Sequence, residues 1–271
     1  MATYVITGVS RGLGWEFLNQ MSSNPANTVV GLVRDKPRTD KRVAEELSGR
    51  SNVTVLEADV TDYDAVKKAA ESSVAVTGGK VDYLIANAGF VSTWDSFGGF
   101  DVLDQNPMEL DEYFIKYLRT NALANIHLFN LFMPQILKGQ VKKVVTISSG
   151  MGDMDFTKDY DVLEAPLYST SKAAMNMISA KFSAQYKEQG VLFLAICPGM
   201  VEVGHFDNIT PDKQEGLQKF VEKFKRYSPT FKGADSPPES IKAVMSVVNN
   251  SSIENGAAGA YLSHFGNKRW V

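Results

Sequence analysis

A tyrosine and a lysine four residues apart form the pair in this sequence best suited to proton transfer. They are Tyr168 and Lys172, in "YSTSK". On a helix, residues at this spacing share one face, so the Lys172 ammonium can approach the Tyr168 phenol. A free tyrosine has a pKa of about 10, and a neighbouring cation lowers that pKa toward neutrality. The pair is a candidate acid–base group, and Ser149, near the end of the preceding apolar run, is a candidate partner.

The Tyr-x-x-x-Lys spacing also occurs at Tyr63 and Lys67. That second pair lies within a helix expected at 62–77, and we interpret it as solvated helix surface. Tyr168 and Lys172 differ because they open a helix that follows the strand expected at 142–148. Open α/β sheets bind ligands at the carboxyl ends of their strands, so the sequence favours Tyr168 and Lys172 as the pair that takes part in proton transfer.

Short β-branched runs alternate along the chain with helical patterns. Strands are expected at 3–7, 28–33, 53–58, 81–86, 142–148, 191–197 and 259–263. Helices are expected at roughly 12–23, 40–48, 62–77, 108–138, 168–189 and 236–249, with a charged helix near 212–226. Several strands are apolar almost throughout rather than alternating, which indicates parallel strands buried on both faces. The alternation predicts an α/β fold: a single-domain Rossmann fold over residues 1–271, with a doubly wound parallel sheet of seven strands and helices on both faces.

The turn after the first expected strand, "TGVSRGLG", contains three glycines. They are Gly8, Gly12 and Gly14. Glycines in a strand–turn–helix let the backbone approach a pyrophosphate, and the free N–H groups that begin the helix bind the anion. The spacing differs from the G-x-G-x-x-G dinucleotide fingerprint. On this motif alone, a plain strand–helix turn remains the alternative.

Composition excludes several classes of function. The formal net charge is −3, which disfavours nucleic-acid binding. Cys197 is the one cysteine, so no disulfide can form within the chain, and the three histidines lie too far apart in sequence for a metal site. No apolar stretch reaches the roughly 18 residues that span a bilayer, and the N-terminus lacks the pattern of a signal peptide. We expect a cytoplasmic protein without a metal.

Six motifs, taken in order, resemble those of the short-chain dehydrogenase/reductase family. They are "TGVSRGLG" at 7–14, "ADV" at 58–60, "ANAG" at 86–89, "ISSGMG" at 147–152, "YSTSK" at 168–172 and "PGMV" at 198–201. The C-terminal "NGAAGAYLSHFGNKRW" is similar to the tail of small fungal and animal carbonyl reductases of that family, most of all the yeast benzil reductase-like group. The resemblance implies reduction of a carbonyl to an alcohol with a nicotinamide cofactor.

The resemblance also implies roles for individual residues. It makes Tyr168 the general acid–base, Ser149 the hydrogen-bond partner of the substrate oxygen, Lys172 the ligand of the nicotinamide ribose, and Asn121 the support of Lys172 through a water. The residues that it implies for cofactor binding are Gly8, Ser10, Arg11, Gly12, Leu13, Gly14, Arg34, Asp59, Val60, Asn87, Ala88, Gly89, Tyr168, Lys172, Pro198, Gly199 and Val201.

The end of the second expected strand indicates which nicotinamide cofactor is preferred. Family members that prefer NAD place an acidic residue at the strand end, where it binds the ribose hydroxyls. Here Val33 stands at that place, Arg34 follows, and Arg11 lies in the glycine turn. Guanidinium groups suit a phosphate dianion, and Asp35 comes one position too late to select NAD. We therefore expect NADP(H) to be preferred over NAD(H).

The sequence departs from the family pattern in two places. Ser149 and Tyr168 are 19 positions apart, a longer separation than is usual in the family. The extra residues form an acidic insertion near 150–167, either a solvated excursion or a rim that shapes substrate specificity. Val203 stands where the family often has a threonine that contacts the nicotinamide carboxamide, within an expected substrate loop near 199–235.

Residues expected near the substrate are apolar or aromatic, which favours a hydrophobic or aromatic ketone or aldehyde. The candidates are Met151, Met200 and Phe206, with Phe90, Val91, Pro198 and His205 beside them. In the family, the helices corresponding to 108–138 and 168–189 pair subunits, which implies a homodimer or homotetramer. Two other functions remain open: an isomerase or dehydratase on the same fold, and a non-catalytic NADP-binding sensor or scaffold.

Overall fold

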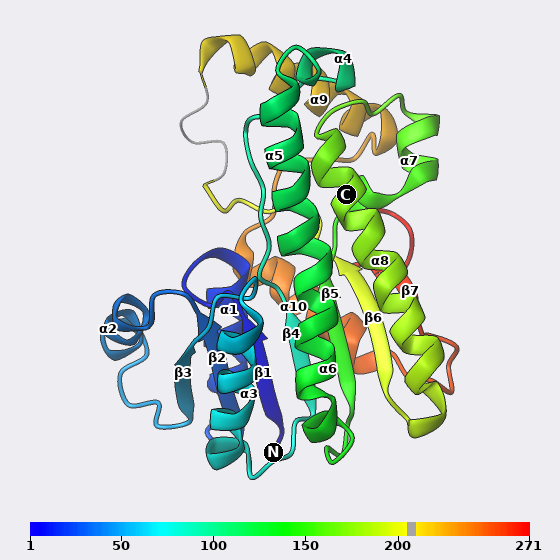
Figure 1. Cartoon of the computed structure of the whole chain (residues 1–271). Helices are drawn as coiled ribbons and strands as arrows, with labels where there is room; N and C mark the ends of the chain where they lie inside the picture. Colours follow the sequence, from blue (N-terminus) through cyan, green and yellow to red (C-terminus); the bar gives the residue numbers. More distant parts are fainter. Residues whose placement is uncertain (205–209) are drawn as a thin grey trace.

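Seven parallel strands form one sheet in the order β3-β2-β1-β4-β5-β6-β7 (Figure 1). The computed structural model describes residues 1–204 and 210–271, with only the backbone of Asp212. The strands are β1 (Thr3–Thr7), β2 (Thr28–Val33), β3 (Val53–Glu57), β4 (Tyr83–Ala86), β5 (Lys143–Ile147), β6 (Leu192–Cys197) and β7 (Ala260–Ser263). Each neighbouring pair is parallel. The order reverses between β1 and β4, as a doubly wound sheet requires, and the predicted Rossmann fold is confirmed.

Helices cover both faces of the sheet, as predicted (Figure 1). One face carries α1 (Gly12–Ser22) and α10 (Pro237–Asn250), and the other carries α3 (Tyr63–Thr77), α6 (Ala124–Ile136) and α8 (Pro166–Tyr186). Strand side chains alternate between the two cores. In β1, Tyr4 and Ile6 pack with α1 and α10, whereas Val5 packs with the other set. This packing holds the strand ends, and therefore the candidate site, on a rigid frame.

The helix expected at 108–138 is divided in three. It consists of α5 (Pro107–Leu118), a π-helical turn (Arg119–Leu123) and α6. A π turn inserts one extra residue and changes the direction of the side chains around it, and such turns are frequent at functional sites. Here the turn contains Asn121, one of the four expected catalytic residues.

Two short helices and one early helix start were not expected from the sequence. The short ones are α4 (Phe100–Leu103) and α7 (Met154–Asp159). Helix α2 runs Lys36–Glu46, earlier than the expected 40–48, because the Asp35 side chain caps it by accepting from the backbone N–H of Arg38. The charged helix near 212–226 is present as α9 (Pro211–Tyr227).

A layer formed by α4, α7 and α9 lies beyond the carboxyl ends of the strands (Figure 1). The segment that contains α9 is closed at its base by backbone pairing between Val201 and Asp235. Its helix is tied to the loop after β4, since the Lys213 ammonium donates to the carbonyl oxygen of Thr93 at 2.7 Å. This layer covers the edge of the sheet where the sequence places the site. No helix in the part of the chain described here is long and apolar enough to cross a membrane.

Candidate active site

Ser149 and Tyr168 come together at the carboxyl end of β5. Ser149 lies two residues after the last residue of β5, and Tyr168 lies in the first turn of α8. A side-chain hydrogen bond joins the two. The helix α8 begins with Pro166, whose fixed φ suits a first helical position. The long insertion between the two residues therefore leaves them in contact.

Lys172 lies one turn further along α8, with its ammonium nitrogen 5.6 Å from the centre of the Tyr168 ring. The side chain is buried, and its ammonium donates to the carbonyl oxygen of Ile147 at 2.8 Å. Burial lowers the pKa of Lys172 from 10.5 to about 8, against a small opposing effect of Cys197. The ammonium is thus costly to keep charged, and two of its three N–H donors remain for other partners.

Burial also sets the acidity of Tyr168. It raises the pKa of the phenol from 10.0 to about 12, and the hydrogen bond with Ser149 opposes this. The lowering expected from the sequence combines Lys172 with the positive nicotinamide ring, and it stays a prediction for the protein with its cofactor bound. In the structure the Lys172 ammonium donates to the backbone carbonyl of Ile147.

Asn121 is held on the opposite side of the site by the π turn. Its side-chain oxygen accepts from the backbone N–H of Phe90 at 2.6 Å, and its amide nitrogen donates to Phe90 O and to Ser171 Oγ, both at 2.9 Å. A Cβ placed on Gly89 would lie 3.3 Å from the Asn121 side-chain oxygen and 3.8 Å from the Lys172 nitrogen. Asn121 therefore joins α8 to the segment that follows β4.

The glycine turn packs too closely to hold larger residues. A Cβ on Gly14 would lie 2.1 Å from the carbonyl oxygen of Gly8. Gly8 and Gly12 have φ of 74° and 56°, which favour glycine. The Asn87 amide donates to the carbonyl oxygen of Thr7 at 3.0 Å, which fixes this turn to the end of β4. The result is a backbone cradle at the start of α1 that fits a pyrophosphate.

Basic side chains surround the glycine turn. Arg11 and Arg34 are exposed, and neither side chain has a hydrogen bond or ion pair to the described residues. Asp35 is already engaged as the cap of α2. Arg42, which the sequence analysis did not single out, lies over the Trp15 ring at 3.9 Å and donates to the carbonyl oxygen of Ser10 at 3.1 Å. Nothing in its sequence position pointed to the turn, since α2 was expected to begin later.

The remaining expected cofactor residues lie along the same edge of the sheet. Asp59 accepts from both the backbone N–H and the hydroxyl of Thr61 with one carboxylate oxygen, at 2.8 Å each. Gly199 has a φ of 85° and packs against His264, where a Cβ would lie 2.7 Å from the ring. Val203 lies over the turn, 3.6 Å from a Cβ placed on Gly12. The set also includes Ser10, Leu13, Val60, Ala88, Gly89, Pro198 and Val201, all within segments that end strands or begin helices.

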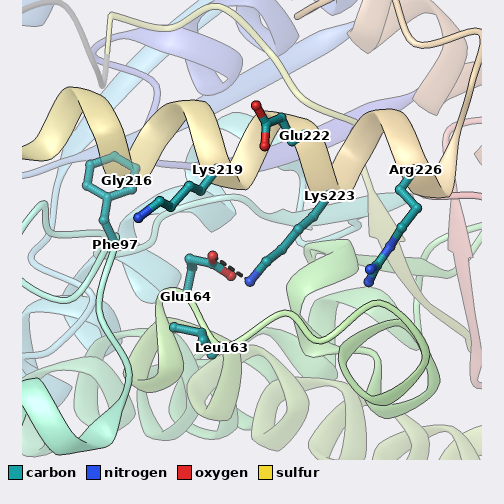
Figure 2. Close-up of a pocket in the computed structure, with 8 residues that line it drawn as sticks. All are labelled: Phe97, Leu163, Glu164, Gly216, Lys219, Glu222, Lys223 and Arg226. Carbon is teal, nitrogen blue, oxygen red and sulfur yellow. Dashed lines mark hydrogen bonds and ion pairs between the residues drawn. The ribbon is translucent and has the colours of Figure 1, made fainter.

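The acidic insertion near 150–167 packs against α9. Lys223 of α9 contacts the buried carboxylate of Glu164 at 2.7 Å and also donates to the carbonyl oxygen of Asp161 (Figure 2). Between the two segments lies a cavity of about 560 Å³, lined by Phe97 and by basic side chains of α9. The insertion is tied to α9 through Asp161 and Glu164, while Met154 and Lys158 within it are exposed.

The expected substrate residues are distributed unevenly. Met151 is buried beside Tyr168 in one apolar cluster, and Met200 is half-buried. His205 and Phe206 lie outside the described residues. Phe90 packs with Tyr168 in a second, aromatic cluster.

The C-terminal tail contributes residues that sequence reasoning missed. The Tyr261 hydroxyl donates to the backbone carbonyl of Ser149, and the Trp270 ring stacks on Tyr261 at 4.4 Å. A Cβ on Gly150 would lie 2.5 Å from Trp270. The tail therefore supports the backbone of Ser149 and Gly150 from beneath. The sequence signal was Trp270, the last residue of the tail stretch that resembles carbonyl reductases, and that resemblance implied no role for it.

Comparison with known proteins agrees with this geometry. The family described as short chain dehydrogenase matches residues 2–214. The short chain dehydrogenase virK of Hypocrea virens is 51% identical over 271 residues, and the short-chain dehydrogenase/reductase iacC of Pestalotiopsis fici is 46% identical over 272 residues; both alignments cover 100% of each chain.

Solved structures share the fold at low identity. The NADPH-bound carbonyl reductase from chicken fatty liver has a TM-score of 0.76 at 23% identity and covers 98% of each chain. The carbonyl reductase Sniffer of D. melanogaster has a TM-score of 0.72 at 19% identity, again with 98% of each chain covered. Since the family match spans most of the sequence and the fungal relatives match it from end to end, this chain belongs to the short-chain dehydrogenases, a family of nicotinamide-dependent oxidoreductases.

Proposed function

We propose that this protein is an NADPH-dependent reductase that converts a hydrophobic or aromatic ketone or aldehyde to an alcohol. One observation carries the proposal: Ser149, Tyr168 and Lys172 meet at the carboxyl edge of the sheet, and Asn121 and Lys172 adjoin the strand end at Gly89. The glycine cradle opens onto the same edge. Membership of an oxidoreductase family fits this arrangement.

Tyr168 and Ser149 would handle the carbonyl oxygen. The bound NADPH supplies the hydride to the carbonyl carbon. As negative charge develops on the oxygen, the Ser149 hydroxyl orients it and the Tyr168 phenol donates a proton. A phenol whose pKa is raised to about 12 is fully protonated at neutral pH, so Tyr168 is prepared to act as an acid in the direction of reduction.

Lys172 would bind the cofactor, and this binding would offset the energetic cost of burying its ammonium. Among the described residues only Ile147 O accepts from it, and burial lowers its pKa to about 8. Hydroxyl groups of the nicotinamide ribose would accept from the two remaining donors and favour the charged ammonium. A cation fixed there then favours the tyrosinate that proton donation leaves behind.

The preference for NADPH rests on the charges around the adenine end of the cradle. Arg11 and Arg34 are exposed beside the glycine turn and the end of β2, so both guanidinium groups can bind a 2′-phosphate. The Asp35 carboxylate, which follows Arg34 in the chain, caps α2. We expect Arg34→Asp to narrow the difference in Kd between NADPH and NADH. Equal affinity of the unaltered protein for both would refute the preference.

The substrate class follows from the side chains beside Tyr168. Met151 lies in the apolar cluster on one side, and Phe90 and Trp94 lie in the aromatic cluster on the other. Such surfaces favour apolar and aromatic carbonyl compounds over sugars.

Assembly into a homodimer or homotetramer through α5, α6 and α8 is part of the proposal. Large apolar side chains are exposed on these helices and the turn between them: Ile115 is 64% exposed, Leu123 46% and Met177 60%. An exposed apolar surface of this kind is typical of subunit contacts. Light scattering after size exclusion measures the mass, and a monomer at micromolar concentration would contradict this part.

The central experiment is a turnover screen with a matched active-site variant. Purified protein and NADPH are mixed with aromatic ketones, diketones, quinones and aliphatic aldehydes, and oxidation of the cofactor is followed by its absorbance. Tyr168→Phe should bind NADPH normally and lose at least about 100-fold in kcat, because the general acid is removed. A non-catalytic sensor would show no turnover in either protein, and an isomerase or dehydratase would form product without net consumption of NADPH.

A further inference from the structure

Asp95 is a fully buried carboxylate that the proposed mechanism does not use. It lies in the loop after β4 and is 0% exposed. One of its oxygens accepts from the Tyr117 hydroxyl at 2.6 Å, and the other accepts from the backbone N–H of Tyr168 at 3.2 Å. A buried charge is costly unless it is fully hydrogen-bonded, so its place next to the proposed acid requires a physical reason.

The carboxylate of Asp95 takes the place of the missing side-chain cap of α8. The N-cap residue of this helix is Ala165, which has no side chain to accept from the first turn. Asp95 accepts there instead, and its own carbonyl oxygen accepts from the backbone N–H of Ala165 at 3.0 Å. A negative charge at a helix N-terminus is stabilised by the helix dipole. The loop after β4 thereby fixes the turn of α8 that presents Tyr168.

Tyr117 links the same carboxylate to the ring of Tyr168. Tyr117 comes from α5 and is 0% exposed. Its hydroxyl donates to Asp95 and accepts from the backbone N–H of Ser92 at 2.8 Å. Its ring lies 6.3 Å from the Tyr168 ring at an interplanar angle of 61°, in an edge-to-face arrangement. Backbone and ring of Tyr168 are therefore both constrained by one pair of side chains.

We propose that Asp95 and Tyr117 are positioning residues for Tyr168, which fix its backbone and ring and place a carboxylate near its phenol. The inference rests on the proposed function, because it assigns the pair to the acid of that reaction. The two residues come from different elements, so the pair forms only when α5, α8 and the loop after β4 are assembled.

The effect of the Asp95 charge on the pKa of Tyr168 has a direction that can be measured. A nearby anion disfavours tyrosinate, and Asp95 contributes to the raised pKa of Tyr168. The other groups that face this phenol are Ser149, which lowers the pKa, Cys197, which raises it, and Lys172 on the same helix. Removing only the charge of Asp95 should move the ionisation of Tyr168 to lower pH.

The test compares Asp95→Asn and Tyr117→Phe with wild type in the holoenzyme. The reaction is single-turnover oxidation, with NADP⁺, of the alcohol formed from the best ketone of the screen, measured across pH. Oxidation requires tyrosinate, so its rate rises with pH through the ionisation of Tyr168. Asp95→Asn should shift that rise in rate to lower pH, by about half a pH unit or more. Tyr117→Phe retains the Asp95 carboxylate, so its profile should shift less than that of Asp95→Asn, while the single-turnover rate falls about tenfold through misplacement of the ring.

Matched controls lie at the opposite end of the sheet. Asp82 accepts from the backbone N–H groups of Thr3 and Gln140, at 2.9 and 2.8 Å, and Tyr83 stacks on Tyr4. Asp82→Asn and Tyr83→Phe therefore make the same chemical changes far from the site. NADPH affinity, measured by fluorescence, should be within about twofold of wild type in all four variants, which would show that the cradle is intact.

The outcomes separate this inference from the proposed function. If wild type turns over and Tyr168→Phe does not, the function stands. If Asp95→Asn and Tyr117→Phe then match their controls in both pH profile and kcat, the positioning role is refuted. If Asp95→Asn fails to fold, Tyr117→Phe decides by its loss of kcat at unchanged NADPH affinity. Absence of turnover in wild type with every carbonyl compound would refute the proposed function itself.

Discussion

Replacing Lys172 by methionine should stabilise the cofactor-free protein while removing its activity. Lys172 is buried, has one hydrogen-bond partner, and has its pKa lowered from 10.5 to about 8. A lysine whose pKa is lowered in the folded state opposes folding at neutral pH, because the unfolded chain holds that proton more tightly. Methionine has a similar length and no charge, so it removes this opposition.

The magnitude follows from the shift in pKa. Each unit corresponds to about 1.4 kcal/mol, so a change from 10.5 to about 8 costs about 3 kcal/mol of stability at pH 7. Methionine cannot donate to Ile147 O, and a lost hydrogen bond of this kind costs about 1 kcal/mol. The expected net gain for Lys172→Met is about 2 kcal/mol at pH 7.

The dependence on pH provides the sharper test. Below pH 8 the lysine is charged in both states and the full cost is present. Between about pH 8 and 10.5 the folded state has released the proton and the unfolded state has not, so the stability of wild type rises with pH relative to the variant. At pH 9.5 the advantage of Lys172→Met should therefore have fallen by about 2 kcal/mol and be close to zero.

Urea unfolding of both proteins at pH 7 and pH 9.5 measures this difference. Wild type and variant share all other titrating groups, so the contributions of these groups to the pH dependence of stability largely cancel. Lys181→Met is the matched control, because Lys181 is exposed on the same helix, and its effect on stability should be small and the same at both pH values. The reasoning is refuted if the free-energy difference between Lys172→Met and wild type does not change with pH. Saturating NADPH should reverse the order of stability, since only wild type can use the ammonium to bind it.

Three further substitutions test how the site is supported. Lys223→Met should lower the free energy of unfolding, measured by urea titration, by about 3 kcal/mol, because it leaves the buried Glu164 carboxylate without its cation. Arg226→Met on the same helix is the control: it breaks an exposed pair and should cost under about 1 kcal/mol in the same titration. Trp270→Ala should cost about 3–5 kcal/mol by thermal and urea unfolding and lower kcat more than it weakens NADPH binding, since the ring supports the serine segment; an unchanged kcat would contradict that support. Gly14→Ala should weaken NADPH binding at least about tenfold in a fluorescence titration, because its Cβ cannot fit against the neighbouring carbonyl; wild-type affinity would show that the cradle does not hold the cofactor.

Sequence alone determined the framework of this protein. The run "TVVGLV" is apolar after its first residue and matches β2 residue for residue, because a strand buried on both faces admits few polar positions. The glycine turn could also be recognised from the sequence, because its geometry requires glycine: Gly14 has no room for a Cβ. Tyr168 and Lys172 could be paired because both lie on one helix, where spacing fixes distance. These features depend on local geometry, and local geometry follows from neighbouring residues.

Tertiary structure decided what depends on distant residues. The pKa of Tyr168 is raised mainly by burial, and burial is a property of the assembled core. Asp95 meets Tyr168 from 73 positions away in the sequence, and Trp270 lies more than a hundred positions from the Gly150 that it supports. Sequence spacing does not predict contacts between residues so far apart, because such contacts exist only once the sheet has brought its strand ends together.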